Sequence, residues 1–352
     1  MKTNLRIAFL LSPKTSIAVW NSLKLHIELC LLCGITVDIY KSIRMNDSLI
    51  QDEYKNNVIE YDSYINLRRS LNKGNYDYIW CPDSLCVLLL KLLFVRCNKI
   101  IYWVQGTAPY ESLMKHQNYL KFWVLSLIET LSFYCSDAYV FVSESMKEFY
   151  EKKYNIGSKL NIVVPCLSEF SNNHSVSKIE KIKNSFVYIG GISVWQCFEE
   201  TLDIYSKVRT EDTIFHIITP DIDKAKELVS RKIGDAKDIE IYCIKDRTRI
   251  PETLSKFEYG FLIRKDNPVN YVASPIKFVE YLSCGVNVIL TKALPAYAKL
   301  VEEYSIGTVV DINNGTPKIN YYSDNAQKIY TEYFNKQIFI DRYKNLLNNL
   351  IG

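Results

Sequence analysis

Short runs of apolar residues alternate with longer stretches in which one face is apolar. The first run, at residues 6–11, is followed by a polar loop, a helix-like stretch at 19–33 that ends at Gly34, and a second run at 35–40. Continuous apolar runs bounded by turn residues are typical of strands that are buried on both faces. A strand–helix–strand opening of this kind predicts a doubly wound α/β domain.

This alternation occurs in two series. We predict further strands in the first series at residues 76–80, 99–104, 138–142 and 161–164. The second series has predicted strands at residues 186–189, 214–219, 239–243, 259–263, 287–290 and 307–311. The stretch between them is polar and contains Ser-Asn-Asn-His-Ser, which is typical of a linker.

The boundaries follow from this pattern. We predict an N-terminal Rossmann-like domain at 1–166, a linker at 167–184, a C-terminal Rossmann-like domain at 185–334 and a closing helix at 335–352. The tail from 325 to 350 is predicted to be one amphipathic helix. The fold class is therefore α/β with two Rossmann-like domains.

Composition narrows the classes of function. The chain has 352 residues, 48% of them hydrophobic and 23% charged, which is typical of globular domains. The formal net charge is only +4 and no basic stripe is present, which argues against a nucleic-acid partner. This balance tolerates a nucleotide substrate or an anionic membrane surface.

The ten cysteines are expected to be free thiols. Most lie within apolar runs, and Cys30 and Cys33 form a Cys-x-x-Cys pair inside a predicted helix without a second pair at ligand spacing. Free buried thiols fit a reducing compartment. Because neither a signal peptide nor a spanning segment is recognised, we expect a cytoplasmic protein. Residues 85–99 and 116–134 are aromatic and partly basic, which suits peripheral membrane contact or ordinary helix packing.

The stretch from 273 to 290 predicts a short helix that leads into a buried strand. Ser274 is predicted to cap the helix, and Pro275 to occupy its first position, where an N–H is not needed. Gly285 is predicted to end the helix before the apolar run 286–290.

This predicted helix carries groups that suit a nucleotide. A helix N-terminus favours an anion, so the N–H groups around Ser274 to Ile276 are candidate phosphate donors. Lys277 adds a charge in the first turn, and Glu280 lies on the same face. A cation and a carboxylate one turn apart suit a phosphate and a ribose. A solvated Lys–Glu surface pair explains the same spacing.

The pattern resembles a known signature. Pro-x-Lys-Phe-x-Glu-Tyr-Leu-x-Cys-Gly-x-x-Val-Ile, preceded by Gly-Phe-Leu-Ile-Arg-Lys-Asp-Asn at 260–267, is similar to the donor-binding segment of GT-B glycosyltransferases of the GT4-like group. The resemblance implies two domains with a cleft between them. It also implies a donor in the C-terminal half, an acceptor in the N-terminal half, and no metal or other cofactor. A UDP- or GDP-type nucleotide sugar is then a substrate.

The resemblance also assigns residues. It implies that Lys277 and Arg264 bind the diphosphate and neutralise its charge during transfer, and that Glu280 accepts from the ribose hydroxyls. An Arg directly after a strand is equally typical of a solvated rim charge.

One position departs from the family pattern. GT4-like enzymes often carry a second Glu eight positions before the one matched by Glu280, and this chain has Val272 there. Asp266, Asn267 and Asn270 are the nearest polar candidates for contact with the donor sugar. The Asp-Asn-Pro sequence at 266–268 is also typical of a simple turn.

The first loop of the second series is glycine-rich. Gly190 and Gly191 would let the backbone approach a diphosphate, as in the donor loop of the resembled family. The cation expected a few residues later is absent, because Gln196 and Cys197 stand there. Trp195 is a candidate to stack on a base or sugar, and a hydrophobic cap explains it equally well.

The loop at 103–111 is the candidate acceptor side. It follows a predicted strand and carries Gln105, Gly106 and Glu111. Many members of the resembled family have a His near this place, where this chain has Gln105. Glu111 is its only carboxylate and is a candidate for contacting the acceptor hydroxyl or acting as base. A Glu favoured by a helix N-terminus explains it as well. Ser143 is expected to be a structural helix cap.

The resulting hypothesis is a hexosyl-type glycosyltransferase, which the resemblance implies to be retaining. Its acceptor would be a glycan or a lipid-linked saccharide in the synthesis of a bacterial surface polysaccharide such as capsule or O-antigen. A GT-B protein that binds nucleotide or glycan without catalysis, and a sugar-nucleotide epimerase on the same fold, remain alternatives.

Overall fold

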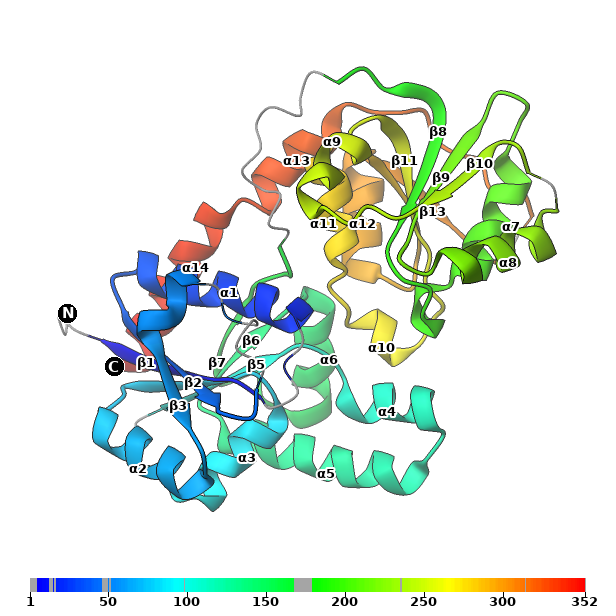
Figure 1. Ribbon diagram of the computed structural model, residues 1–352. Helices are drawn as coiled ribbons and strands as arrows, with labels where there is room; N and C mark the ends of the chain where they lie inside the picture. Colours follow the sequence, from blue (N-terminus) through cyan, green and yellow to red (C-terminus); the bar gives the residue numbers. More distant parts are fainter. Residues whose placement is uncertain are drawn as a thin grey trace. The chain divides into compact units, whose positions relative to one another are not determined.

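The structure, a computed structural model, describes residues 5–12, 15, 17–45, 50, 52–97, 99–167, 179–234, 236–313 and 315–351 (Figure 1). The chain divides into two compact units, which we describe separately. Unit 1 comprises Met1–Pro165 and Lys336–Gly352, and unit 2 comprises Cys166–Asn335.

Unit 1 is built on a parallel sheet with seven strands in the described residues, in the order β3-β2-β1-β4-β5-β6-β7. The strands are β1 Arg6–Leu10, β2 Thr36–Ser42, β3 Val58–Tyr61, β4 Tyr78–Cys81, β5 Lys99–Val104, β6 Ala138–Phe141 and β7 Leu160–Val163. The helices are α1 Ile17–Leu32, α2 Tyr64–Gly74, α3 Ser84–Leu92, α4 Ala108–His116, α5 Tyr119–Cys135, α6 Glu144–Tyr154 and α14 Lys336–Ile351, with the 3-10 helix η2 Asp52–Asn57.

Unit 2 has a parallel sheet with six strands in its described residues, in the order β10-β9-β8-β11-β12-β13. The strands are β8 Ile182–Ile189, β9 Ile214–Ile218, β10 Ile239–Tyr242, β11 Phe257–Leu262, β12 Asn287–Thr291 and β13 Gly307–Val310. The helices are η5 Val194–Gln196, α7 Phe198–Val208, α8 Ile222–Lys232, η6 Arg247–Arg249, α9 Ile250–Leu254, α10 Pro268–Tyr271, α11 Ile276–Ser283, α12 Pro295–Tyr304 and α13 Asn325–Tyr333.

This architecture confirms the predicted fold class. Each sheet is parallel, with helices joining its strands, and the central strands are buried because helices cover the sheet (Figure 1). In unit 2 the chain runs from β8 outward to β9 and β10, and then returns to β11 on the other side of β8. This reversal creates a switch point at the carboxyl ends of β8 and β11, where ligands bind in open α/β sheets.

Some elements differ from their predictions. Strand β3 was not predicted, because its sequence, Val-Ile-Glu-Tyr, is only partly apolar and its residues are mostly not buried. Strand β8 begins at Ile182, inside the range predicted as linker, because its first three residues are exposed and read as polar connection. Residues 168–178 of that predicted linker lie outside the described residues.

The predicted single helix at the tail is wrong. The helix ends at Tyr333 and a new one starts at Lys336, so α13 belongs to unit 2 and α14 to unit 1. The sequence does not indicate the break, because each of the two helices buries an apolar stripe and the helical period of apolar residues continues through it. Phe334, at the break, is buried in the core of unit 2.

An aromatic cluster anchors α14 to unit 1. Nδ1 of His26 on α1 is hydrogen-bonded to the hydroxyl of Tyr343 on α14. The His26 ring lies 5.0 Å from the Trp80 ring and 4.5 Å from the Trp103 ring, between centroids. Burial lowers the pKa of His26 to about 3, so this residue is a neutral part of the core.

Candidate functional site

The switch point of unit 2 brings together residues from three segments that are distant in the sequence. The glycine loop follows β8, Arg264 follows β11, and Lys277 and Glu280 lie on α11. Strands β8 and β11 are neighbours in the sheet, so their carboxyl ends bring these segments close together. The topology therefore gathers the predicted donor residues at the place where a ligand is expected.

Two cations converge on one neutral oxygen. Oε1 of Gln196 accepts a hydrogen bond of 2.8 Å from Nζ of Lys277 and another of 2.8 Å from Nη2 of Arg264. Nη1 of Arg264 also donates to the backbone oxygens of Gln196, at 3.3 Å, and Ile263, at 2.8 Å. Among the described residues, no carboxylate forms a salt bridge with either cation. The pair is therefore arranged as a site for an anion.

The electrostatics support this interpretation. The pKa of Lys277 is well below its usual value, first because burial disfavours the charged form and second because Arg264 is close, while Glu280 opposes the shift. Burial also lowers the pKa of Arg264. Among the described residues neither group forms a salt bridge, so an anion bound between them would relieve an existing cost.

The glycine loop makes room for Lys277. Gly190 has a φ of +120°, and a Cβ at this position would lie 2.6 Å from Cε of Lys277 and 2.9 Å from its Nζ. The ammonium group lies 4.2 Å from the centroid of the Tyr188 ring, and the Tyr188 hydroxyl donates to the Gly191 oxygen at 2.7 Å. Glycine at 190 is thus needed for both its backbone and its lack of a side chain.

The start of α11 differs from its prediction. Pro275 is the N-cap, one position later than the predicted Ser274, and no side chain caps the helix. The hydroxyl of Ser274 is hydrogen-bonded to the Tyr297 hydroxyl at 2.7 Å and accepts from the Cys166 N–H at 3.0 Å, so its predicted capping role is wrong. Tertiary partners therefore replace the local cap. The predicted end is confirmed, because Gly285 has a φ of +66° directly after the helix.

Glu280 is buried and lies near a cation that we did not predict. Its residue is only 5% exposed, and its Oε1 lies 3.7 Å from Nη2 of Arg247. The Arg247 side chain is 63% exposed. Arg247 could not be predicted from the sequence, because it belongs to the short helix η6, more than thirty residues away from Glu280 along the chain. A buried carboxylate beside a long, exposed cationic side chain suits contact with the hydroxyl groups of a ligand.

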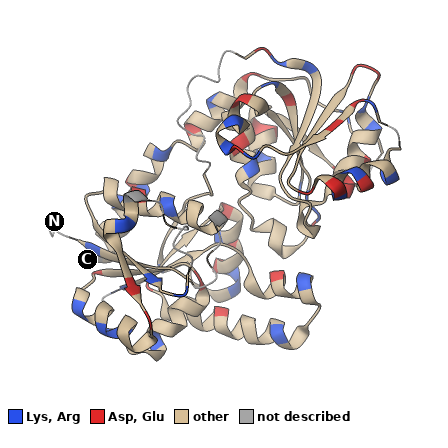
Figure 2. Ribbon diagram, viewed as in Figure 1, with Lys and Arg blue, Asp and Glu red and all other residues tan. Residues whose placement is uncertain are grey.

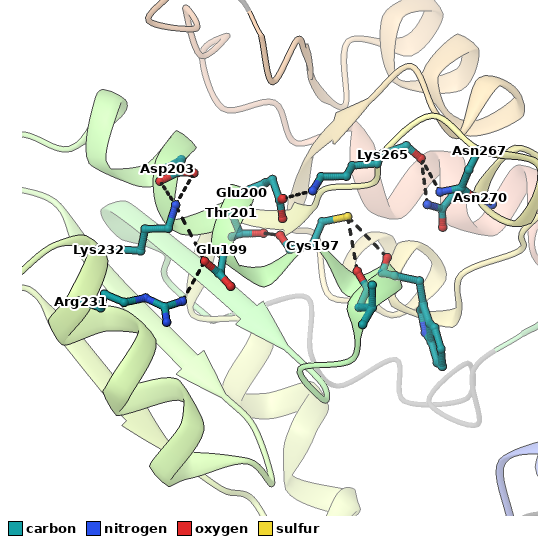
Figure 3. Close-up of polar contacts among 12 residues, drawn as sticks. Cys197, Glu199, Glu200, Thr201, Asp203, Arg231, Lys232, Lys265, Asn267 and Asn270 are labelled. Carbon is teal, nitrogen blue, oxygen red and sulfur yellow. Dashed lines mark hydrogen bonds and ion pairs between the residues drawn. The ribbon is translucent and has the colours of Figure 1, made fainter. Parts of the chain in front are cut away.

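The segment predicted to replace the missing Glu folds as a short helix. Asn267 caps α10 by accepting from the Asn270 N–H at 2.9 Å, and the side-chain amides of both donate to the Lys265 oxygen (Figure 3). Lys265 in turn forms an ion pair with Glu200 on α7 (Figure 3). Val272 is fully buried.

These contacts separate the three predicted candidates. Asn270 is buried and Asn267 is part of the cap, so both side chains have structural partners. Asp266 is exposed and lines a pocket of about 380 Å³ at the carboxyl ends of β11, β12 and β13. Its lining residues are Arg264, Asp266, Thr291, Lys292, Ala293, Val309, Val310, Asp311, Ile312 and Asn313. Arg264 is common to this pocket and to the pair of cations.

Trp195 belongs to η5, next to the convergent oxygen of Gln196. Its side chain is partly buried. Cys197, at the second position where a cation was expected, has a φ of +49° and is buried. Arg264 supplies from β11 the positive charge that the loop itself lacks.

The predicted acceptor residues lie in unit 1. Nε2 of Gln105 donates to the Pro82 oxygen at 2.6 Å. Glu111 is in the first turn of α4, and its Oε1 would lie 2.1 Å from a Cβ on Gly106, so this glycine makes room for the carboxylate. The Gly106 oxygen accepts from the Tyr150 hydroxyl at 3.0 Å. Gln105 and Gly106 therefore lie in the loop after β5, and Glu111 follows them on α4.

The predicted capping role of Ser143 is confirmed. Ser143 caps α6, and its hydroxyl accepts from the Met146 N–H at 3.0 Å. Asp83 caps α3. His216 lies within β9, where burial lowers its pKa. No cluster of three metal-ligating side chains is present in the part of the chain that the structure describes.

Comparisons with known proteins were informative at the level of structure. No family model matches the sequence, and no curated protein sequence matches it. The lipopolysaccharide outer core galactosyltransferase WaaB in its apo form is similar, with a TM-score of 0.69, 14% identity, and coverage of 98% of this chain and 99% of that one. Sucrose-phosphate synthase from Thermosynechococcus elongatus has a TM-score of 0.67, 12% identity, and coverage of 99% of both chains.

A further structure on the same fold has a different activity in its name. A putative UDP-N-acetylglucosamine 2-epimerase from Listeria monocytogenes gives a TM-score of 0.50 at 13% identity, over 98% of this chain and 88% of that one. At these identities the comparisons establish the fold, which is the two-domain Rossmann-like architecture called GT-B.

Proposed function

We propose that this protein, a chain with the GT-B fold, is a glycosyltransferase that uses a nucleoside-diphosphate-sugar donor. The observation that carries the proposal is the convergence of Lys277 and Arg264 on one neutral oxygen at the switch point of unit 2. The same architecture over nearly the full chain in WaaB and sucrose-phosphate synthase supports it.

The geometry suits a leaving diphosphate. When the bond between the sugar and the diphosphate breaks, negative charge develops on the diphosphate oxygens, and two fixed cations in a site of low polarity stabilise it. Lys277 and Arg264 fill this role without a metal ion. Glycines 190 and 191 let the backbone approach the same group, and the N–H groups of Ser274 and Ile276 are further donors; Pro275 has none.

We assign the rest of the donor to the residues that surround the two cations. Glu280, buried one turn along α11, accepts from the ribose hydroxyls, and Trp195 is the candidate to stack on the base or sugar. Asp266 is the strongest of the three candidates for the sugar, because its carboxylate faces a pocket that Arg264 shares. Asn267 and Asn270 then position that segment.

On the acceptor side, Glu111 is the proposed catalytic base or acceptor contact, with Gln105 and Gly106 beside it. The proposed acceptor is a glycan or a lipid-linked saccharide, and transfer of a hexose with retention at the anomeric carbon is the form of the reaction that the sequence resemblance implies. The proposed setting is the cytoplasmic side of the cell membrane, in the synthesis of a surface polysaccharide such as capsule or O-antigen.

A second candidate is a sugar-nucleotide epimerase. The similarity to a structure named as a putative epimerase favours this alternative, because the same fold and a nucleotide site serve both reactions. A protein that binds nucleotide without catalysis is the third. The three differ in what they produce from a nucleotide sugar.

Calorimetric titration with UDP, GDP, CDP and TDP and with their sugars tests the donor site. We expect one diphosphate to bind, and Lys277→Ala and Glu280→Ala to weaken it by roughly tenfold or more, since each removes a charge-assisted hydrogen bond. Lys299→Ala, an exposed lysine on α12, is the control and should bind normally. Absence of any diphosphate binding would contradict the proposal.

Product analysis then separates the activities. A transferase releases nucleoside diphosphate in proportion to glycosylated acceptor. Conversion of the nucleotide sugar without any acceptor would instead establish the epimerase, and binding without turnover for all sugars and acceptors would establish the non-catalytic protein.

A further inference from the structure

Helix α5 of unit 1 buries Glu129, Ser132 and Phe133, so polar side chains face its core side together with one aromatic ring. Glu129 and Ser132 are buried, at 2% and 0% exposure. Glu129 accepts from the hydroxyls of Tyr150 and Tyr154 at 2.8 and 2.6 Å, and pairs with Lys153 at 2.6 Å. Glu129 thus contacts α6, whereas the Ser132 hydroxyl donates to the backbone oxygen of Ser84 on α3.

The outward face of the same helix is apolar. Its exposed side chains are Tyr119, Leu120, Trp123, Val124, Leu127, Leu131 and Tyr134, with exposures between 43% and 77%. Positions 120, 124, 127, 131 and 134 recur at intervals of four and three, so they form one continuous stripe along the helix. Burial in the core of unit 1 does not explain these residues.

Helix α3 packs beside α5 and extends this stripe. Leu85 and Leu92 on α3 are 55% and 75% exposed, and Phe94, directly after the helix, is 78% exposed. Phe94 also has a φ of +50°, a costly backbone conformation for an aromatic residue. We call the nine exposed apolar residues of these two helices, together with Phe94, the α3–α5 surface. An apolar surface of this extent on one unit indicates a partner.

The exposed charges on α3 and α5 themselves have one sign. Lys91 and Lys121 are the charged residues of α3 and α5 that are exposed, and Glu129, the only acid in the two helices, is buried. Arg96 lies after α3, and Lys115 ends α4, which contacts α5; both are exposed. In Figure 2 the ribbon of α5 is mostly tan, the colour of uncharged residues.

We propose that the α3–α5 surface docks on a lipid bilayer that contains anionic lipids. Leucines and aromatic residues would enter the boundary between headgroups and acyl chains, and the surrounding cations would contact the headgroup phosphates. Trp and Tyr, placed here at positions 119, 123 and 134, are the residues that favour this boundary. No helix of the described residues could cross a membrane, so the contact is peripheral.

A second copy of the chain fits this surface less well. Two copies joined through the stripe would bring Lys91, Lys121 and their neighbours together without an exposed carboxylate on either helix to pair with them. A bilayer with anionic headgroups supplies the missing negative charge. The proposal rests on the proposed function only in one respect, namely that docking would place the enzyme next to a lipid-linked acceptor.

Vesicle co-sedimentation of the full-length protein tests the proposal. We expect binding to vesicles of phosphatidylcholine with phosphatidylglycerol, and weaker binding to phosphatidylcholine alone or at high salt. The double variant Leu120→Gln/Leu127→Gln should reduce the partition coefficient by roughly tenfold or more, because it removes two inserted side chains. Lys91→Gln/Lys121→Gln should remove most of the preference for the anionic lipid.

Ile65→Gln is the matched control, because Ile65 is 64% exposed on α2 of the same unit but lies outside the α3–α5 surface; it should bind vesicles like the wild type. Circular dichroism and diphosphate titration check that each variant is folded and that the nucleotide site is intact.

If the wild type binds no vesicles, or if the Leu120/Leu127 variant binds as well as Ile65→Gln, the proposal is wrong. Sedimentation velocity that shows a dimer dissociated by the Leu120/Leu127 variant would instead assign the surface to a second copy. Neither result would bear on the diphosphate titration, so the two proposals fail separately.

Discussion

At the scale of single residues, the candidate site in unit 2 is defined by two cations that share one neutral hydrogen-bond acceptor. Lys277 and Arg264 are held 2.8 Å from the same amide oxygen of Gln196. An amide is suited to this place, because its oxygen accepts from both cations in the empty site and its NH₂ group can donate to an anion that displaces the oxygen. Gln196 stands where the sequence resemblance led us to expect a cation, and its neutral side chain avoids a third positive charge beside Lys277 and Arg264.

Replacement of Gln196 by Glu should have opposite effects on stability and on binding. The new carboxylate would pair with both cations and raise the free energy of unfolding by about 1 kcal/mol, since neither cation forms a salt bridge among the described residues. The same carboxylate would compete with the diphosphate and weaken its binding by roughly tenfold or more. Thermal unfolding and calorimetry measure the two effects. Gln196→Ala is the comparison and should lower stability; parallel behaviour of the two variants would contradict this role.

Lys277 should take up a proton when the diphosphate binds at alkaline pH. Burial and Arg264 lower the pKa of Lys277 in the empty site, so between that lowered pKa and 10.5 the folded protein holds fewer protons than the unfolded chain. Stability of the empty protein therefore rises with pH in this window. A bound anion favours the charged amine and restores the proton.

Calorimetry in two buffers of different ionisation enthalpy measures this uptake, and Lys277→Met should abolish it. Identical binding enthalpies in both buffers across the alkaline range would show that Lys277 is already charged in the empty site.

At the scale of elements, α11 is held by Tyr281, which links it to β8 and β11. The Tyr281 hydroxyl accepts from the Ile189 N–H at 3.3 Å and lies 3.3 Å from the Phe261 oxygen. Gly260 on β11 faces the Tyr281 ring, and a Cβ there would come within 2.7 Å of it. The register of α11 against the sheet, and so the position of Lys277, depends on this glycine.

Gly260→Ala is therefore expected to weaken both stability and binding. The added methyl group forces Tyr281 away from β11, at a cost of about 1–3 kcal/mol in the free energy of unfolding. Because Lys277 moves with the helix, affinity for the diphosphate should also fall. Denaturant unfolding and calorimetry test this. Gly157→Ala, which meets no atom within 4 Å, is the control; equal stability of the two variants would exclude the close contact.

At the scale of the whole molecule, the chain crosses between the two units twice, and its last helix returns to the first unit. Helix α14 contacts α1 and β7, and the His26–Tyr343 hydrogen bond lies within that interface. The stability of unit 1 thus depends on residues at the opposite end of the sequence.

The interface of α14 should make stability depend on pH through His26. The pKa is about 3 in the folded protein against 6.5 in the unfolded chain, so the unfolded chain binds more protons between these values. Stability present above pH 6.5 is expected to fall by about 1.4 kcal/mol per pH unit below it. Urea unfolding of the wild type and His26→Gln between pH 7 and pH 5 measures this. The variant should lack this part of the slope, and equal slopes would contradict the prediction.

The sequence by itself determined the features that depend on local order. Apolar runs and turn residues predicted most strands of both sheets, and Gly285 predicted the end of α11, because a left-handed residue after a helix strongly favours glycine. The sequence likewise predicted that Lys277 and Glu280 share one face of a helix, since the helical period decides which residues share a face.

Only the tertiary structure decided which distant groups meet. Gln196 between Lys277 and Arg264, and Arg247 beside Glu280, join segments that no sequence period relates. Ser274 does not cap α11 as predicted, because its hydroxyl is hydrogen-bonded to the Tyr297 hydroxyl and the Cys166 N–H. The aromatic stretch at 116–134 suited either membrane contact or packing in the sequence, because a stripe of apolar residues has the same period whether it faces a core or the outside. Its exposure became known once Glu129, and not Leu127, was found to face the core.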